Sequence, residues 1–331
     1  MKGQFRFLLS LVAVLTAGVL LAACGGGQEQ GSGQQGGSAQ GGGQPGQQNL
    51  IQPVANAPQK TITVGSKNFD EQYILGEIYA QALEAAGFNV KTELDIGSEV
   101  VAFEALQQGE IDAYPEYTGT ALTSFFDRKL DEVPKEPTEA YEAARAAYAK
   151  EQIVALPPTP FENSYRLGML RETAQRLGGP KVISDLQGKA QNLSVTGFPE
   201  CEQRTDCLIG VERTYGLEFG EFVSSESPYQ VLDSKEADVA FVFTTDGDLA
   251  TGKYQVLDDD RNFFPPYNIS FTMRDEAARM IGQQGMEVIK RIQAPLTDEV
   301  MQELNSRVAV DAQEPETVAR EYLTQFGFIR K

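Results

Sequence analysis

The chain contains no histidine among its 331 residues. This absence excludes Ser-His-Asp and Cys-His catalysis, histidine-ligated zinc or haem, and the titratable switch that histidine provides near neutral pH. Catalysis by carboxylates, lysine or tyrosine stays open, but the expectation of an enzyme falls. We predict a protein that is not an enzyme and that has neither a cofactor nor a metal ion.

Positive charge is also scarce. Lysine and arginine number 28 against 47 aspartates and glutamates, which gives a formal net charge of -19. Such a surface repels nucleic acid and anionic lipid headgroups, so we expect no nucleic-acid partner. Hydrophobic residues make up 41% of the chain, enough for buried cores, and the length favours two domains.

The N-terminus has the charged, apolar and small-residue regions of a secretory signal in order. Lys2 and Arg6 precede an apolar run over residues 7–21, which meets Leu-Ala-Ala-Cys-Gly at residues 21–25. This end is similar to a bacterial lipobox, in which Cys24 becomes the lipidated first residue. An ordinary signal peptide with an incidental cysteine is the alternative. We predict a signal peptide over residues 1–23 and a lipid anchor that holds the protein outside the cytoplasmic membrane.

The segment that follows is poor in apolar residues. Residues 24–59 are dominated by Gly and Gln, with prolines toward the end. Such a composition buries little apolar surface, which predicts a flexible tether. We expect the folded part to begin at about Lys60.

Cysteine is rare as well, with three in the chain. Once Cys24 is assigned, Cys201 and Cys207 remain in one loop of an exported chain, which indicates a disulfide. A pair of metal ligands is the competing interpretation, but no histidine or further cysteine completes such a site.

Strand and helix patterns alternate after Lys60. Alternating apolar residues at 61–65 predict a strand, and the apolar spacing of Ile74, Ile78 and Ala82 predicts a helix capped by Asn68 or Asp70. Further strands are expected at 89–94, 111–114, 165–170, 193–196, 237–243 and 254–257, and helices at 99–108, 137–150 and from 275 onward. This order is typical of an α/β fold.

Two stretches repeat the same pattern. Residues 106–118 align without gaps on residues 232–244, and each runs from a helix end through an acidic turn and a strand to an aromatic residue followed by Thr. Ligands of open α/β sheets bind outside the carboxyl ends of the strands. We therefore expect Tyr117 and Phe243 to face each other across a cleft between two lobes.

The stretch DAYPEYTGTAL at residues 112–122 supplies part of that site. Pro115 is expected to end the pairing of the strand, and Gly119 to permit a tight turn. Tyr117 and Thr120 are then left at the rim of the cleft.

Aromatic residues beside turn signals recur in several segments. Tyr117, Tyr165, Tyr267 and Phe243 would offer electron-rich ring faces to a quaternary ammonium, which donates no hydrogen bond. Each alone has a plainer interpretation, in which the ring covers the core and the hydroxyl meets water. Lys67 lies between a strand end and a helix start, where an anion is favoured, although a solvated lysine is the alternative.

Four segments together resemble one known family. VGSKNFDEQYILGEI, FEALQQGEIDAYPEYTGT, FTTDG and DDDRNFFPPYN are similar to the glycine betaine/choline-type substrate-binding proteins of osmoprotectant ABC transporters, in that family's order and over residues 61–328. The resemblance implies an α/β, two-lobed periplasmic-binding-protein fold of type II with the ligand in the cleft between the lobes. We expect residues 60–162 with 266–331 to form lobe 1, and residues 163–265 to form lobe 2.

The resemblance also implies the ligand-binding residues. Tyr117, Tyr165 and Tyr267 match aromatic cage positions, and Phe243 stands where many members have Tyr. Lys67, Thr120 and Arg204 match positions that hold the carboxylate of a betaine, with Asn68 and Gln72 beside them. The sequence places Arg204 in the cysteine loop, where a surface ion pair is the alternative.

The family implies a protein that captures a quaternary-ammonium osmoprotectant and hands it to an ABC permease with its ATPase. Retention of Lys67, Thr120 and Arg204 favours betaine-like zwitterions over choline. Three alternatives stay open: the same fold binding another polar solute, such as an amino acid or another betaine; an exported enzyme that uses Tyr and carboxylates; and a sensory lipoprotein.

Overall fold

The computed structural model describes residues 49–331. The predicted signal peptide at residues 1–23, the lipidation of Cys24 and the tether up to residue 48 lie outside the described residues. Within residues 49–331, no helix combines the length and the apolar character needed to cross a bilayer.

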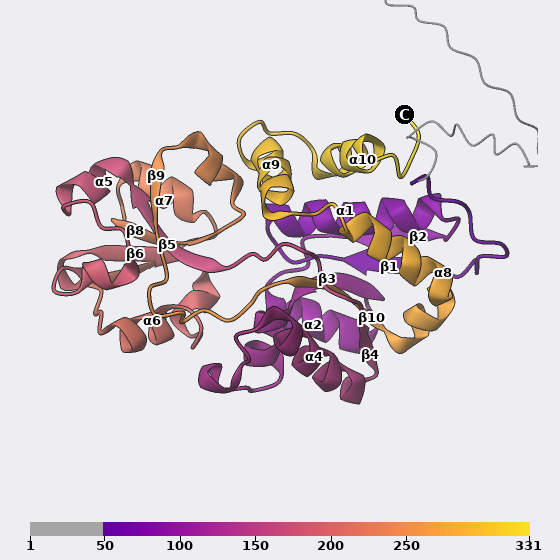
Figure 1. Cartoon of the computed structure of the whole chain (residues 1–331), viewed down its shortest axis with the longest axis horizontal. Coiled ribbons are helices and arrows are strands. Elements are labelled where there is room, and N and C mark those ends of the chain that lie inside the picture. Colours follow the sequence, from indigo (N-terminus) through magenta and orange to yellow (C-terminus); the bar gives the residue numbers. More distant parts are fainter. Residues whose placement is uncertain (1–48) are drawn as a thin grey trace, which may run out of the picture. The chain divides into compact units, whose positions relative to one another are not determined.

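The first sheet has five strands in the order β2-β1-β3-β10-β4. Strand β1 is parallel to β2 and β3, whereas β10 is antiparallel to β3 and β4. Helices α1, α8 and α10 lie on one side of this sheet and α2 and α4 on the other (Figure 1). The strands are β1 (Ile62–Gly65), β2 (Val90–Glu93), β3 (Ala113–Tyr117), β4 (Ile153–Ala155) and β10 (Ile269–Arg274).

The second sheet repeats this plan in the order β7-β6-β8-β5-β9. Strand β6 is parallel to β7 and β8, and β5 is antiparallel to β8 and β9. Strand β8 therefore occupies the same place in its sheet as β3 does in the first, which confirms the equivalence expected from the sequence repeat. The strands are β5 (Tyr165–Leu170), β6 (Ser194–Gly197), β7 (Glu221–Ser224), β8 (Val239–Phe243) and β9 (Tyr254–Leu257).

Helices separate the strands in both sheets. α8 contains a kink at Gly282, whose φ of 58° is a left-handed conformation that glycine adopts without steric cost. The helices are α1 (Asp70–Ala85), α2 (Glu99–Gln108), α3 (Thr118–Thr120), α4 (Pro137–Tyr148), α5 (Arg171–Arg176), α6 (Leu208–Tyr215), α7 (Pro228–Ser234), α8 (Asp275–Gln293), α9 (Asp298–Ala309) and α10 (Pro315–Gln325).

Two segments connect the sheets, one before β5 and one before β10 (Figure 1). They pair with each other through an isolated antiparallel bridge between Glu162 and Asn268. Next to this bridge, the backbone N–H of Asn163 donates a hydrogen bond to the backbone carbonyl of Tyr267 at 3.2 Å. The two connections therefore run side by side, and they bring Asn163 and Tyr267 together between the sheets.

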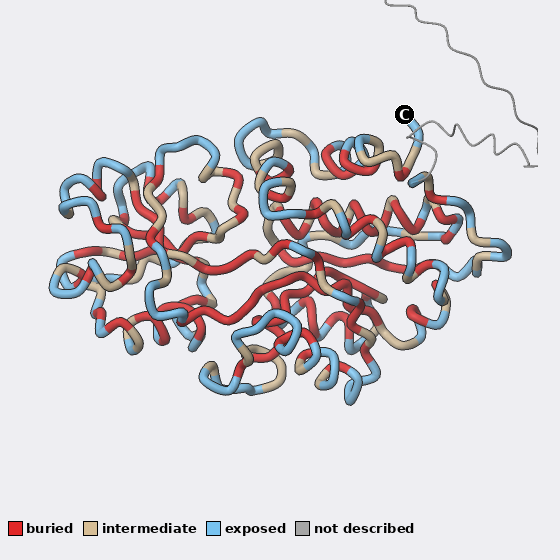
Figure 2. The backbone as a smooth tube through the Cα atoms, in the orientation of Figure 1, coloured by how far each residue is buried: buried red, intermediate tan, exposed pale blue. Residues whose placement is uncertain are grey.

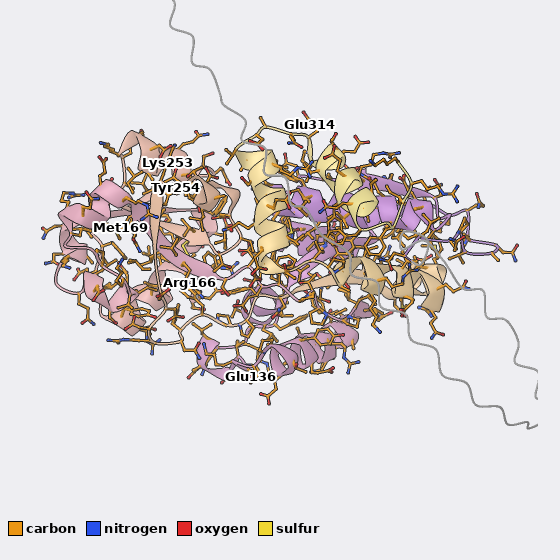
Figure 3. All side chains as sticks on the ribbon, turned by 45° about the horizontal axis from the view of Figure 1, so that its top comes forward. Glu136, Arg166, Met169, Lys253, Tyr254 and Glu314 are labelled. Carbon is orange, nitrogen blue, oxygen red and sulfur yellow. A yellow bond between two sulfur atoms is a disulfide. The ribbon has the colours of Figure 1, made fainter. Side chains whose placement is uncertain are left out.

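The strands and the inner helix faces are buried, while the loops at the periphery are exposed (Figure 2). One continuous apolar cluster includes residues of both sheets, and Tyr117, Tyr165 and Tyr267 belong to it. Charged side chains such as Glu136, Lys253 and Glu314 extend outward from the surface (Figure 3). The aromatic residues predicted as a site thus form part of the apolar contact between the two halves.

The packed chain begins earlier than the sequence indicated. The Ile51 side chain is 5% exposed and belongs to the main core, and its backbone N–H donates to the Phe328 carbonyl at 2.9 Å. The Val54 N–H likewise donates to Ala86. The expectation that folding begins at about Lys60 is therefore wrong for residues 49–59, because the apolar Ile51 and Val54 pack on the helices of the first sheet.

Two local expectations are also wrong. Pro115 does not end its strand: it pairs with Phe271 in the middle of β3, and pairing continues to Tyr117. The first residue before α1 is Phe69, without a side-chain cap, so neither Asn68 nor Asp70 caps this helix. Gly119 lies in a helical turn, and its lack of a side chain allows the Tyr267 ring to approach, since a Cβ there would lie 2.8 Å from that ring.

Candidate functional site

All seven ligand-binding residues expected from the sequence line one pocket between the two sheets. The pocket is partly open to solvent. Asn68 lines it as well, whereas Gln72 lies behind it and accepts a hydrogen bond from the Lys67 backbone N–H. The lining residues are Lys67, Asn68, Phe69, Glu99, Tyr117, Thr120, Asn163, Tyr165, Phe198, Glu200, Arg204, Phe243 and Tyr267.

Aromatic rings form the wall of this pocket. The Tyr165 ring lies 4.6 Å from Phe243 and 5.7 Å from Tyr267, centroid to centroid. Phe69 stands between Tyr117 and Phe243, 6.2 Å from each. Tyr117 and Phe243, at equivalent strand ends, thus both reach the pocket. They do not meet directly, because the Phe69 ring just before α1 separates them.

Tyrosine hydroxyls hold these rings in place. The Tyr117 hydroxyl donates to Glu71 at 2.8 Å, and the Tyr267 hydroxyl donates to Asp206 at 2.8 Å. Burial raises the pKa of both tyrosines, which keeps their hydroxyls neutral. The hydroxyl of each of these two tyrosines is therefore held by a carboxylate.

Lys67 already has an acidic partner. Its Nζ lies 2.6 Å from Glu116 Oε1, and both side chains are almost fully buried. The same ammonium lies 4.3 Å from the centroid of the Tyr117 ring. Lys67 thus lines the pocket, but its charge is paired with Glu116 and rests against the Tyr117 ring.

Arg204 has acidic partners too. Its guanidinium donates to both oxygens of Asp206, at 2.8 and 2.6 Å, and to Glu99 at 2.7 Å. Although burial alone would raise the pKa of Asp206, the Arg204 charge holds it below the usual value. The Arg204–Glu99 pair connects the second-sheet loop to the start of α2 beside the first sheet, and a guanidinium suits such paired, desolvated positions.

A disulfide closes the loop that carries Arg204. Cys201 and Cys207 are bonded, and both are buried, at 1% and 0% exposure. The ring contains Arg204 and Asp206, and Asp206 also accepts a hydrogen bond from Thr123 of the first sheet's side at 3.2 Å. The short ring thereby presents its charged groups to the pocket in a constrained loop.

Glu71 is a buried carboxylate that the sequence did not single out. It accepts from Tyr117 and Asn163 on one oxygen, at 2.8 and 2.9 Å, and from Thr245 and Asn305 on the other, at 2.5 and 2.9 Å. Burial raises the pKa of Glu71, and the four hydrogen bonds oppose that rise. One side chain thus ties a cage tyrosine to residues near both sheets.

Sequence reasoning missed five lining residues: Phe69, Glu99, Asn163, Phe198 and Glu200. Phe69 and Asn163 had an available signal, since they lie two residues from Lys67 and Tyr165. The glutamates had none, because an acid at a helix start or in a loop is usually solvated.

Comparison with known proteins gives consistent relatives. Residues 60–325 match the family described as the substrate-binding domain of an ABC-type glycine betaine transport system. A glycine-betaine-binding protein of Pseudomonas aeruginosa is 33% identical over 284 residues, covering 81% of this chain and 89% of that protein. A crystal structure described as a glycine betaine/carnitine/choline ABC transporter has a TM-score of 0.65 at 24% identity, covering 80% of this chain and 99% of the other.

A further relative is longer than this chain. The ergothioneine transport permease/ergothioneine binding protein of Helicobacter pylori is 29% identical over 273 residues, covering 81% of this chain. The chain spans about half of that protein, 48% of its length. The structural likeness confirms the α/β, two-lobed fold of type II periplasmic binding proteins, with the pocket between the lobes.

Proposed function

Because the chain belongs to the family of substrate-binding domains of ABC-type glycine betaine transport systems, we propose that it captures a quaternary-ammonium osmoprotectant and delivers it to an ABC permease. Members of this family bind solutes outside the cytoplasm and are not enzymes, in agreement with the expectation from composition. Binding rather than turnover is the function to test.

One observation carries the proposal: six of the thirteen residues that line the pocket are aromatic. Tyr117, Tyr165, Phe243 and Tyr267 surround a buried space together with Phe69. A methylated ammonium is weakly hydrated and donates no hydrogen bond, so it loses little free energy on leaving water. Each favourable contact with a ring face stabilises the bound cation by about 0.5–2 kcal/mol. A cation with N–H donors would lose hydrogen bonds in the same place.

The proposal assigns roles within the pocket. The aromatic residues bind the methylated cation, and Lys67, Thr120 and Arg204 face the opposite, polar end of the solute. The two lobes, proposed as residues 60–162 with 266–331 and residues 163–265, close on the solute about the paired connections. Closure makes the bound state recognisable to the permease.

Calorimetric titration tests this function directly. Purified protein from residue 49 onward should bind at least one of glycine betaine, choline, carnitine and proline betaine with one site per chain. Tetramethylammonium, which keeps the cation alone, should bind more weakly than the best of the four. Absence of heat with every compound would overturn the proposal.

We also propose that Cys24 carries a lipid that anchors the protein to the membrane from outside, with residues 1–23 removed as a signal peptide. The support is the sequence alone, with Leu-Ala-Ala-Cys at residues 21–24. Expressed in a bacterium fed labelled palmitate, the full chain should take up label, and Cys24→Ser should not. Label retained in the Cys24→Ser variant would contradict the anchor.

A second candidate keeps the fold and changes the solute. Two carboxylates, Glu99 and Glu200, line the pocket, and neither is required for a betaine. They favour a solute with more polar groups than glycine betaine, in line with the ergothioneine-binding relative. Titration with a betaine that bears a heteroaromatic ring separates the two candidates.

A further inference from the structure

At the pocket, the carboxylates outnumber the positively charged side chains. Lys67 is paired with Glu116, and Arg204 is paired with both Asp206 and Glu99. Two cations thus face three carboxylates before any ligand is considered. A ligand carboxylate is not needed to neutralise either cation, and on binding it would compete with partners already in contact.

A fourth carboxylate has no partner. Glu200 lines the pocket from the position just before Cys201, and within residues 49–331 its side chain accepts no hydrogen bond from another residue and forms no ion pair. Burial and the nearby charge of Glu99 raise its pKa, and the charge of Arg204 offsets part of that rise. The pocket therefore holds a partly desolvated acceptor that the protein itself leaves unsatisfied.

A second acceptor at the pocket is also unsatisfied. Asn163 is 4% exposed and lines the pocket, and its Nδ2 donates to Glu71. Its Oδ1, on the other branch of the amide, is buried and has no hydrogen-bond partner in the described chain. An unsatisfied buried acceptor costs on the order of 1–3 kcal/mol, but this atom is covered by protein, so a ligand donor would reach it only after its neighbours move.

We propose that Glu200 determines specificity, and that the solute is a methylated ammonium carrying an O–H or N–H donor that reaches Glu200. The inference rests on the proposed function and narrows its substrate class. Choline-type alcohols, carnitine-type hydroxy acids and betaines with a ring N–H belong to this class. Glycine betaine does not, because it has no hydrogen-bond donor for Glu200.

Two matched ligand pairs test the class on the wild-type protein. The first pair is choline and its methyl ether, (2-methoxyethyl)trimethylammonium, which differ in the hydroxyl donor. The second is histidine betaine and its form with the ring N–H methylated. Titration calorimetry at pH 7.5 should show, in at least one pair, that the donor-bearing compound binds about 10-fold tighter or more.

Variants then assign the effect to Glu200. In Glu200→Ala, the dissociation constants of the two members of that pair should lie within about 3-fold of each other. In Glu200→Gln, the ratio of the two dissociation constants should lie between the wild-type and alanine values, because the amide oxygen still accepts a hydrogen bond. Glu202→Gln is the matched control, since Glu202 is an exposed glutamate on the same loop, and it should keep the wild-type ratio.

The outcomes separate this inference from the proposed function. If none of these compounds and no betaine binds the wild type, the proposed function fails together with the inference. If methylated ammonium solutes bind but removal of the donor changes the dissociation constant in neither pair, the inference alone is wrong. Glycine betaine binding tightest, and tighter still as the pH falls, would show instead that Glu200 is protonated and donates to the ligand carboxylate.

Discussion

Tyr117 presents one ring face to the Lys67 ammonium at 4.3 Å and sends its hydroxyl to Glu71. At the scale of single residues, this side chain therefore has two separable parts, a ring that a cation can contact and a hydroxyl that positions the ring. A phenylalanine at position 117 keeps the ring and loses the hydroxyl, whereas a leucine loses both. The two substitutions distinguish a cage residue from a structural one.

We predict that Tyr117→Leu weakens binding of the best quaternary-ammonium solute by about 10-fold or more, from the loss of about 1–2 kcal/mol of cation–π contact. Tyr117→Phe should weaken it by less than about 3-fold, because the ring face remains. Titration calorimetry measures both, with circular dichroism to verify folding. Unchanged affinity in the leucine variant would place the cation elsewhere.

Asp246 is a second residue with a measurable signature. It lies after β8, and its Oδ2 accepts from the Phe243 backbone N–H and the Tyr229 hydroxyl, each at 2.7 Å. Burial raises its pKa to about 7. Between about pH 4 and pH 7, the folded state therefore keeps a proton on this carboxyl, whereas the unfolded state has already released it. The carboxyl contributes stability at low pH, and this contribution is lost as the pH rises to about 7.

We expect Asp246→Asn to remove this dependence, since the amide oxygen can accept the same two hydrogen bonds without a charge. From pH 4 to pH 8 the free energy of unfolding of the wild type should fall relative to the variant, by on the order of 1–4 kcal/mol. Urea denaturation at several pH values measures the difference. A difference that is constant with pH would contradict the raised pKa.

At the scale of elements, we expect the disulfide loop to affect ligand binding more than the stability of the fold. The 3₁₀ helix Pro199–Glu202 leads into it, and Glu200 and Arg204 line the pocket, with Asp206 paired to Arg204 beside it. Asp206 in turn accepts from Tyr267, in the segment that connects the sheets, and from Thr123, after β3 of the first sheet. The conformation of this loop therefore decides where several polar groups face the ligand.

The double variant Cys201→Ser, Cys207→Ser should bind the best solute about 10-fold or more weakly. Opening so small a ring should lower the free energy of unfolding by on the order of 2 kcal/mol, leaving the fold intact. Calorimetry and urea denaturation measure the two effects. Glu202→Ala, on the same loop and exposed, is the control, and wild-type affinity in the double variant would show that the loop keeps its shape without the bond.

At the scale of the whole described chain, Glu71 joins the two halves. It projects from α1 and accepts from Tyr117 at the end of β3, Asn163 in a connecting segment, Thr245 beyond β8 and Asn305 in α9. A carboxylate with four donors has its acceptor sites filled, and a glutamine offers one oxygen fewer. The two donors facing its new amide group would then be unsatisfied.

We predict that Glu71→Gln lowers the free energy of unfolding by about 2–4 kcal/mol, since two buried donors lose their acceptor. Glu84→Gln, at an exposed position of the same helix, should change it by less than about 0.5 kcal/mol. Urea denaturation without ligand measures both variants. Equal stability of the two would show that this network does not hold the halves together.

The secondary structure could largely be predicted from local pattern. Helix α2 has the bounds expected from the sequence, residues 99–108, and β5 begins and ends where the alternation indicated. The error at Pro115 has a clear cause, because the turn preference of proline is overridden by pairing with β10, a strand more than 150 residues later. The start of the packed chain was missed because Ile51 stands isolated in a polar segment.

The sequence by itself determined the α/β order and the repeat of strand plan, because side-chain periodicity and strand ends record burial along the chain. The full set of seven residues that line one pocket came from the resemblance of the sequence motifs to a known family. Only the tertiary structure decided the partners of those residues. Glu116 and Asp206 neutralise Lys67 and Arg204, and Phe69 stands between Tyr117 and Phe243. Such pairings depend on how distant segments cross, which no local spacing encodes, and they leave Glu200 as the acceptor without a partner.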